Sequence, residues 1–312
     1  MRNAVSRLYA RSPVTLGLLA GYFADAALGD PGRGHPVAWF GRAAAAVERR
    51  TWGDSRVRGA LHTTLCTGVV TGFGALAQAK AGPRLRFAVT ALATWTVLGG
   101  RSLAREGEIM ARLLDAGDLP AARARLGHLC GRDATNLDER ELARAATESV
   151  AENTSDAVVA PLLWGAVAGI PGLLAYRAIN TLDAMIGHRS PRYLKFGWAA
   201  ARVDDVANFV PSRIAALTAI GLSGNPGRAG RTWLSDRARH PSPNAGQVEA
   251  AFAGALRVRL GGVNSYGGRT ENRGTLGDGP APGPDDLRRA VRLSRAVGWA
   301  TLGLVCAVRA AK

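Results

Sequence analysis

Six apolar stretches, separated by charged segments, constrain the fold of this 312-residue chain more than any other feature. They lie at about residues 13–28, 59–79, 85–100, 157–175, 209–222 and 296–308. A membrane-spanning helix needs about 20 apolar residues, and about 17 can suffice. The second and fourth stretches reach that length, the first and third reach it with their polar flanks, and the last two are short. The pattern predicts an all-α, polytopic integral membrane protein of the cell membrane, with roughly four to six spanning or re-entrant helices.

A soluble all-α protein with buried alanine-rich helices is the alternative, because no stretch is as apolar as a typical single-span anchor. On the membrane interpretation, residues 1–312 form a single membrane-embedded catalytic domain. Residues 101–150 are then a soluble helical insertion with a break around Gly117–Pro120, in which Asn136 or Asp138 caps the following helix. The Gly- and Pro-rich residues 223–285 are expected to form a polar loop region.

The charge balance narrows the class of partner. The formal net charge is +16, and nearly all basic residues are arginine. This composition suits nucleic acid, anionic lipid or an anionic substrate. Aromatic residues make up only 6% of the chain, and no RNA-binding or helix-turn-helix signature is present, so we expect no nucleic-acid partner. The three cysteines are far apart and without a CxxC pair, which predicts free thiols and no zinc site.

The stretch "ESVAENTSDAVVAP", Glu148 to Pro161, places carboxylates immediately before an apolar run. On a straight α-helix Glu141, Glu148, Glu152 and Asp156 share an arc of about 80°, with Asn153 beside them. Acids at this spacing repel one another unless a cation lies between them, and all-oxygen ligands favour Mg²⁺ shared with a phosphate. The alternative is a solvated acidic face paired with neighbouring arginines. Ionisable groups beside a membrane run are costly and usually functional.

Two further segments combine acids, amides and arginines next to apolar helix. They contribute Arg177, Asn180 and Asp183 from "YRAINTLDAMIG", and Arg202, Asp204, Asp205 and Asn208, followed by Arg213, from "ARVDDVANFVPSRI". One such group is commonly a cap or an ion pair, but three in one chain predict the walls of a single polar cavity suited to magnesium and phosphate.

Proline-marked loops supply the remaining polar residues. They are Asp30, His35, His240, Asn244, Asn264 and Tyr266. A histidine before proline is most often a surface turn, and neither HExxH nor GxxxxGK[ST] occurs, so a zinc protease site and a P-loop are excluded.

Taken together, "GDPGRGHPV", "ESVAENTSDAVVAPLLWG", "AYRAINTLDAMIGH", "FGWAAARVDDVANFVPSRI", "HPSPNAG" and "GGVNSYGG" resemble the CbiB/CobD family of cobalamin biosynthesis. The resemblance runs in the same order from about Gly21 to Tyr266 and is weak in residues 267–312. It implies a membrane-bound adenosylcobinamide-phosphate synthase, a carbon–nitrogen ligase. Such an enzyme joins a propionate carboxylate of adenosylcobyric acid to aminopropanol or its phosphate.

The resemblance also implies ATP as co-substrate and Mg²⁺, with no tightly bound organic cofactor, and the lipid bilayer and other late corrin-pathway membrane enzymes as partners. We assign catalytic roles to Glu148, Glu152, Asn153, Asp156, Asn180, Asp183 and Asp205. The metal ligands among these are Glu152, Asp156, Asp183 and Asp205. Substrate- or phosphate-binding residues are Asp30, His35, Arg177, Arg202, Asp204, Asn208, Arg213, His240, Asn244, Asn264 and Tyr266.

Two other classes of protein remain open. An intramembrane, magnesium-dependent prenyl- or phospho-transferase also holds metal between acidic clusters, although "RVDDVAN" is only half of a DDxxD repeat. A cation or corrinoid transporter would line its pathway with similar residues, but transporters usually have more spans and internal repeats.

Overall fold

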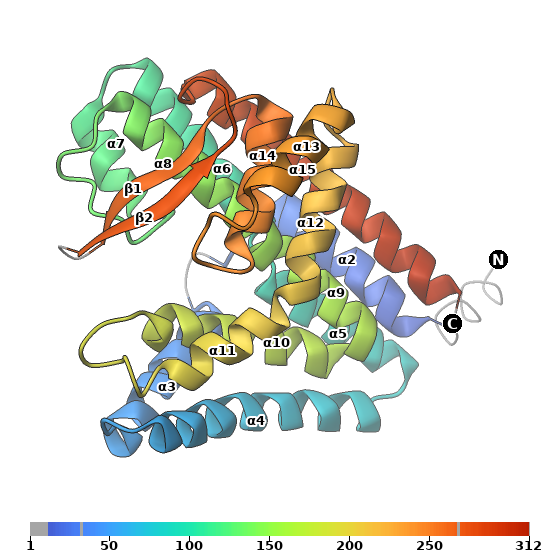
Figure 1. Ribbon diagram of the computed structural model, residues 1–312. Helices are drawn as coiled ribbons and strands as arrows, with labels where there is room; N and C mark the ends of the chain where they lie inside the picture. The colour runs from blue at the N-terminus through green and yellow to red at the C-terminus, as the bar shows by residue number, and fades with distance from the viewer. Residues whose placement is uncertain (1–11, 32–33, 267–268, 312) are drawn as a thin grey trace. The chain divides into compact units, whose positions relative to one another are not determined.

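The computed structural model describes residues 12–31, 34–266 and 269–311, without the side chains of 265–266 and 269–270. Helices dominate this part of the chain, together with one two-stranded sheet (Figure 1). The chain divides into two compact units. Unit 1 comprises Met1–Gly99, Ala160–Asn208 and Leu302–Lys312, and unit 2 comprises Gly100–Val159 and Phe209–Thr301.

Unit 1 is entirely helical among the described residues. Its elements are α2 (Pro13–Leu28), α3 (Pro36–Thr51), α4 (Arg56–Lys80), α5 (Pro83–Val97), α9 (Ala160–Ala168), α10 (Ile170–Leu182), the π-helix η2 (Asp183–Gly187) and α11 (Trp198–Ala207). Helices α2 and α5 pack closely because Gly17 and Gly21 leave room for Thr90 and Thr94; a Cβ at either glycine would lie within 2.5 Å of the facing threonine Cβ. Small residues at this i,i+4 spacing are typical of helix packing in membranes.

The predicted apolar helix over 157–175 is interrupted. Gly169 adopts φ 70° between α9 and α10, and Pro171 follows in the first turn of α10. The two helices pack against each other as a hairpin, with Gly172 close to the carbonyl of Trp164. The apolar stretch at 157–175 therefore forms two helices in place of one, because glycine in the left-handed region ends a helix and proline begins the next.

Unit 2 combines helices with a hairpin. Its elements are α6 (Gly100–Asp115), α7 (Leu119–Leu126), α8 (Glu139–Thr154), the π-helix η1 (Ser155–Val159), α12 (Phe209–Gly221), α13 (Pro226–Asp236), α14 (Ala245–Leu256), β1 (Leu260–Tyr266) and β2 (Arg269–Leu276). Helix α15 (Pro284–Ala310) belongs to unit 2 up to Thr301. Helix α14 is buried along nearly its whole length because it contacts α8, α12, α13 and both strands.

Residues 101–150, predicted to form a helical insertion, contain α7 and most of α6 and α8. Helices α6 and α7 are separated around Gly117, and Asp138 caps α8 in a reciprocal capping box with Glu141. The predicted polar loop region at 223–285, by contrast, contains α13, α14 and the β1–β2 hairpin. The strands could not be predicted because they lack alternating apolar residues. The irregular register between Gly261 and Val263 also interrupts the two-residue alternation of side chains between the faces of a strand.

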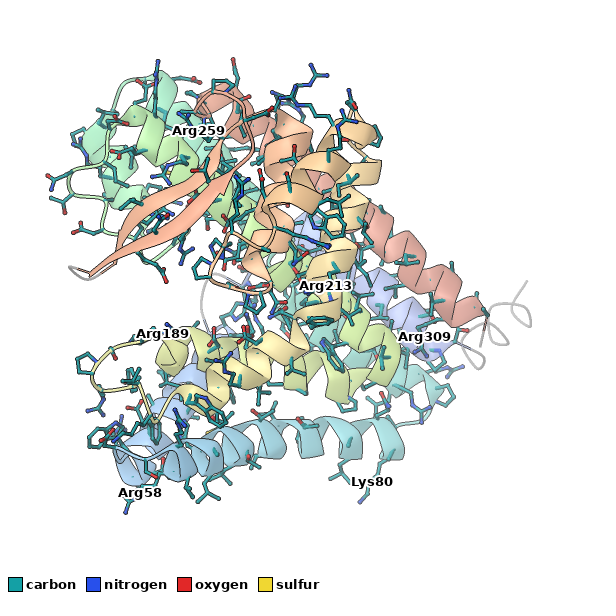
Figure 2. All side chains as sticks on the ribbon, in the orientation of Figure 1. Arg58, Lys80, Arg189, Arg213, Arg259 and Arg309 are labelled. Carbon is teal, nitrogen blue, oxygen red and sulfur yellow. The ribbon has the colours of Figure 1, made fainter. Side chains whose placement is uncertain are left out.

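Two helices among the described residues, α4 and α15, are long and apolar enough to cross a membrane, judged by length and composition, while α2 and α12 are apolar but shorter. Four to six membrane helices are thus not confirmed. Figure 2 shows Arg58 and Lys80 at opposite ends of α4. Between them, large apolar side chains such as Leu61, Val69 and Phe73 are 64–70% exposed. The cysteines are free, as predicted.

Candidate functional site

The predicted site residues fall into both units, and each unit holds its own polar cluster. Unit 2 contains Glu148, Glu152, Asn153, Asp156, Arg213, His240, Asn244, Asn264 and Tyr266. Unit 1 contains Asp30, His35, Arg177, Asn180, Asp183, Arg202, Asp204, Asp205 and Asn208. The side chain of Tyr266 lies outside the described part.

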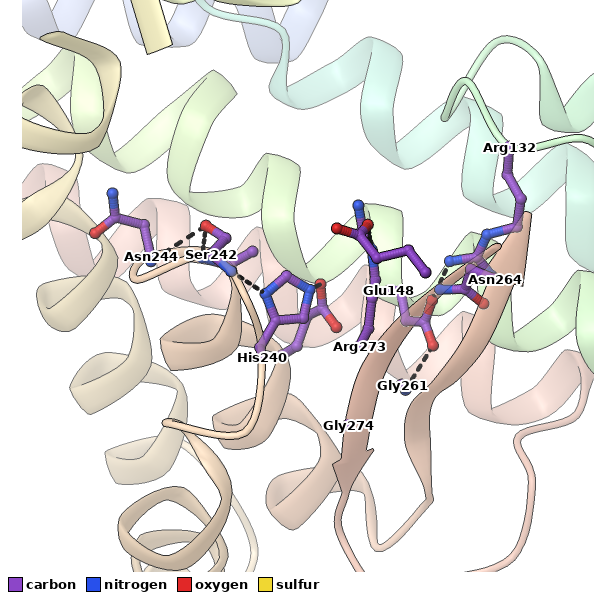
Figure 3. A network of polar contacts seen from close by, with 12 residues as sticks. Arg132, Glu148, His240, Ser242, Asn244, Gly261, Asn264, Arg273 and Gly274 are labelled. Atoms are coloured by element: carbon purple, nitrogen blue, oxygen red, sulfur yellow. Dashed lines mark hydrogen bonds and ion pairs between the residues drawn. The ribbon is translucent and has the colours of Figure 1, made fainter. Parts of the chain in front are cut away.

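Glu148 is the centre of the unit 2 cluster (Figure 3). Its carboxylate is buried and accepts a hydrogen bond of 2.5 Å from Arg132 Nη2, one of 3.2 Å from Arg144 Nη1 and one of 2.7 Å from the Gly261 amide. Arg132 enters from the loop before α8, Arg144 from one turn earlier in α8, and Gly261 from β1. A buried carboxylate needs such partners, since an unpaired buried charge is very costly.

Asn264 and Arg144 connect the hairpin to α8. Arg144 Nη1 donates to Asn264 Oδ1 at 3.0 Å and also contacts the Gly261 carbonyl oxygen. Asn264 is buried, with 3% of its surface exposed. The structure therefore brings together two predicted residues, Glu148 and Asn264, through an arginine that the sequence reasoning had treated only as a surface partner.

Glu249 is a functional candidate that the sequence analysis missed. It lies in α14, is 1% exposed, and neither carboxylate oxygen has a hydrogen-bond partner among the described residues. His240 Nε2 is 3.7 Å from its Oε1. Burial raises the pKa of Glu249, and the charges of Glu148 and Glu152 raise it further. The available signal was that Glu249 is the one charged residue in "AGQVEAAFAGAL".

His240 is held in one tautomer by its own loop. The Ser242 amide donates to His240 Nδ1 at 3.0 Å, so in the neutral ring the proton resides on Nε2, the atom that faces Glu249. Burial lowers the pKa of His240 to about 4, helped by the charge of Arg273. The ring is thus a neutral hydrogen-bond donor at neutral pH.

The same loop positions Asn244, which hydrogen-bonds to Arg213. The backbone N–H of Asn244 donates to Ser242 Oγ at 3.3 Å. Arg213 Nη1 donates to the side-chain oxygen Oδ1 of Asn244 at 3.3 Å. The Arg213 guanidinium also stacks on Phe209, 3.6 Å from the ring centre. These contacts show that Arg213, Asn244 and His240 belong to one connected part of unit 2.

Glu152, Asn153 and Asp156 follow one another along the chain but have different surroundings. Glu152 is half-buried, and burial raises the pKa of its carboxyl group, while the charge of Arg273 opposes this. Asn153 turns back on its own helix and donates to the Ser149 carbonyl oxygen at 2.9 Å. Asp156 lies in η1, where the wider π-helical turn ends the straight α-helix that the predicted acidic arc assumed. That arc is therefore wrong beyond Thr154.

In unit 1, Asp204 lies next to Asp183. Asn208 Nδ2 donates to Asp204 Oδ2 at 3.0 Å, and the buried Asn208 accepts from the Tyr176 hydroxyl at 2.9 Å. Burial, and then the charge of Asp183, raises the pKa of Asp204 to about 7, although hydrogen bonds from Asn208 and Asn180 oppose the shift. The two acids Asp183 and Asp204 thus lie close enough for the charge of one to act on the pKa of the other.

Asp205 occupies a more exposed position. It accepts a hydrogen bond of 3.0 Å from Arg202, and their side chains are 30% and 60% exposed respectively. Asp204, more than Asp205, is therefore the acid that the structure places under the influence of Asp183.

His35 repeats the turn seen at His240. It caps α3, and the Val37 amide donates to its Nδ1 at 3.2 Å. Burial lowers the pKa of His35; the charge of Asp30 opposes this, and the charge of Arg177 adds to it. Arg177 also donates to Asn180 Oδ1 at 3.4 Å. The chain therefore contains two His-Pro turns, one in each unit, in which Nδ1 of the histidine accepts a backbone amide.

The described residues contain no group of three or more His, Cys, Asp or Glu side chains that could together hold a metal ion. The predicted ligands are divided between Glu152 and Asp156 in unit 2 and Asp183 and Asp205 in unit 1. Mg²⁺ commonly uses only one or two carboxylates together with substrate phosphates. Asp183 and Asp204 fit that requirement, whereas Glu148 is already neutralised by two arginines.

Residues 18–294 match the family described as CobD/Cbib protein. The "Cobalamin biosynthesis protein CobD" of Mycobacterium tuberculosis is 55% identical over 94% of this chain and 96% of its own length. The proteins of the same name from Chromobacterium violaceum and Rhodobacter capsulatus are 44% and 43% identical, covering 91% and 87% of this chain and 94% and 90% of their own lengths. No solved structure matches the chain significantly.

Proposed function

Since this chain belongs to the CobD/Cbib protein family, we propose that its part in cobalamin biosynthesis is to form an amide bond. The substrate is a corrinoid: a propionate carboxylate of adenosylcobyric acid is joined to aminopropanol or its phosphate, with ATP as co-substrate. The product is adenosylcobinamide or its phosphate, and the enzyme is a carbon–nitrogen ligase.

A carboxylate and an amine do not condense at a useful rate in water, so the carboxylate is activated first. A carboxylate oxygen attacks the terminal phosphorus of ATP, and ADP leaves. The amine nitrogen then attacks the acyl carbon, phosphate leaves with the bonding electron pair, and the nitrogen loses a proton. Glu152 is suited to accept that proton because burial raises the pKa of its carboxyl group above the ordinary range.

The buried charge network of unit 2 is the observation that supports this proposal most. Glu148, Glu152 and Glu249 share one interior with Arg132, Arg273 and the neutral donor His240. Buried acids with perturbed pKa values cluster at functional sites, since a merely stable core would be better served by apolar residues. Arginines of this kind suit carboxylate and phosphate groups.

Asp183 and Asp204 are the residues we propose to hold Mg²⁺. Their mutual repulsion would be relieved by a divalent cation. When bound, Mg²⁺ neutralises charge on phosphoryl oxygens. Within the chain, Asn208 orients Asp204 and is itself oriented by Tyr176.

Asparagine substitution separates the two neighbouring acids. Asp204→Asn is expected to lower turnover at least about 100-fold, because a buried ligand carboxylate is lost. Asp205→Asn should lower it only a few-fold, because its partner Arg202 is largely exposed and Asp205 itself is partly exposed. Turnover measured against Mg²⁺ concentration checks this: partial rescue by Mg²⁺ in Asp204→Asn marks the ligand. The reverse order of effects would restore Asp205 as the ligand predicted from the sequence.

We further propose that the protein lies in the cell membrane. The exposed apolar side chains along α4 support this, since monomeric soluble proteins rarely expose such a row. The close packing of α2 and α5 at glycines adds to that support. A multi-pass arrangement is part of the same proposal.

One assay tests the function against its rivals. Purified membranes containing the protein are given adenosylcobyric acid, aminopropanol phosphate, ATP and Mg²⁺, and the product is identified by mass. We expect amide product only when all components are present. Accumulation of unmodified corrinoid inside sealed vesicles would instead indicate a transporter, and transfer of a prenyl or phosphoryl group without amide formation would indicate a transferase.

A further inference from the structure

A pocket of about 230 Å³ opens on unit 2 at the start of α8. Its walls include Arg140 and Arg144 of α8, Arg259 and Gly262 at the start of the hairpin, and Ala281. Figure 2 labels Arg259 at this hairpin. None of these residues is among the catalytic, metal-binding or substrate-binding residues predicted from the sequence.

Three arginines, Arg140, Arg144 and Arg259, line this pocket, and the side chains of two of them have no partner in the described part of the chain. Arg140 and Arg259 make no side-chain hydrogen bond or ion pair with the described part of the chain. Arg144, one helical turn after Arg140, is already directed by Glu148 and Asn264. Like charges at i,i+4 spacing on a helix repel each other, so an anion between them would be favourable.

The two acids that line the pocket are already engaged with backbone. Asp138 Oδ1 accepts the Glu141 amide at 2.8 Å, and Glu141 Oε2 accepts the Asp138 amide at 3.0 Å. This reciprocal capping box satisfies the first turn of α8, and neither carboxylate is paired with the pocket arginines among the described contacts. The acids therefore hold the helix start in place and leave the arginines available.

Gly262 lies beside the Arg144 guanidinium at the wall of the pocket. It adopts φ +91°, a conformation that side chains rarely allow, and a Cβ there would lie 3.7 Å from Arg144 Nη1. A longer side chain would extend over that guanidinium. The glycine leaves this wall of the pocket without a side chain. Arg144 Nη1 is already engaged by Glu148 and Asn264, so the free guanidinium groups among the described residues of the pocket are those of Arg140 and Arg259.

We propose that this pocket binds the phosphate group of a small molecule. Planar guanidinium groups bind phosphate oxygens through paired, charge-assisted hydrogen bonds. The volume of about 230 Å³ admits a phosphate with a short chain, or the phosphate end of a nucleotide, but not a corrin ring. The inference rests on the proposed function only for the identity of the molecule that carries the phosphate.

Titration calorimetry on the purified full-length protein tests the site without turnover. The probes are ATP without metal, the phosphorylated amino alcohol of the proposed reaction, inorganic phosphate, and the unphosphorylated amino alcohol as a negative control. Arg140→Gln and Arg259→Gln should each weaken phosphate binding about tenfold, since each removes one charge-assisted contact.

Ala281→Trp should weaken phosphate binding to a similar extent, because the larger side chain fills the pocket without changing its charge. Arg231→Gln, an exposed arginine of α13 outside the pocket, is the matched control and should change Kd less than about twofold.

The probe that depends on the pocket identifies the source of the phosphate. Tight binding of ATP alone assigns a nucleotide, tight binding of the phosphorylated amino alcohol assigns the amine substrate, and equal binding of inorganic phosphate assigns the released product. The site is refuted if no phosphate-bearing probe binds the wild-type protein, or if Arg231→Gln weakens binding as much as the pocket variants do. Because these titrations need no catalysis, they remain decisive even where the amide assay finds no product.

Discussion

Replacing Glu148 by Gln is expected to destabilise unit 2 by about 3–5 kcal/mol. The substitution preserves shape but removes the charge that Arg132 and Arg144 face, and the Arg132 and Glu148 side chains are each only 3% exposed. Removing one partner of a buried pair leaves the other charge without compensation. Thermal unfolding in detergent should show a drop in Tm on the order of 10 °C for a unit of this size.

Glu108→Gln is the matched control for that experiment. Glu108 pairs with Arg295 at 2.9 Å, but their side chains are 42% and 53% exposed, so the loss should stay within about 1 kcal/mol. Equal, small effects in both variants would mean that water or the neighbouring acids compensate Arg132, and the buried network would lose its structural role.

The second large effect is expected at Glu152. Glu152→Gln should leave the protein folded, because the change is nearly isosteric and the side chain is half-buried, yet lower turnover roughly 100-fold or more. The reason is that the amide cannot accept a proton or carry the negative charge that faces Arg273. Turnover at saturating substrates checks the size of the loss. The Mg²⁺ concentration for half-maximal rate separates two roles: an unchanged requirement marks the proton acceptor, and a raised one marks the metal ligand predicted from the sequence.

Glu141→Gln controls for the loss of an acid on the same helix. Its side chain serves the capping box of α8, a task that glutamine also performs, so activity should change only slightly. Similar activity in Glu152→Gln and Glu141→Gln would return Glu152 to an ordinary solvated helix face.

The sequence predicted those features that depend on local pattern. Each of the six apolar stretches lies in helical structure, and Asp138 caps α8 as its place before the periodic segment indicated. The Gly169 break was also readable, since Gly-Ile-Pro is a strong helix interruption, but the length of the apolar run outweighed it. The hairpin left no such signal, because its strands are polar and rich in glycine.

The contacts of the site could be predicted only where the two residues are close together in the sequence. The turn that joins His240 to Ser242 and Asn244 is contained in "HPSPN". The partners of Glu148 are not local: Arg132 comes from the preceding loop and Gly261 from the distant hairpin, so no spacing rule could pair them. Glu249 was overlooked because one acid in an apolar helix shows no pattern until its buried surroundings are known.

Isotope transfer tests the central claim of carboxylate–amine condensation most directly. Adenosylcobyric acid labelled with ¹⁸O in its free carboxylate is incubated with the protein, aminopropanol phosphate, ATP and Mg²⁺, and both products are weighed by mass spectrometry. The account predicts one ¹⁸O atom in the released phosphate for every amide formed, because the carboxylate oxygen leaves with the phosphoryl group. ATP hydrolysis with unlabelled phosphate and no amide product would contradict it.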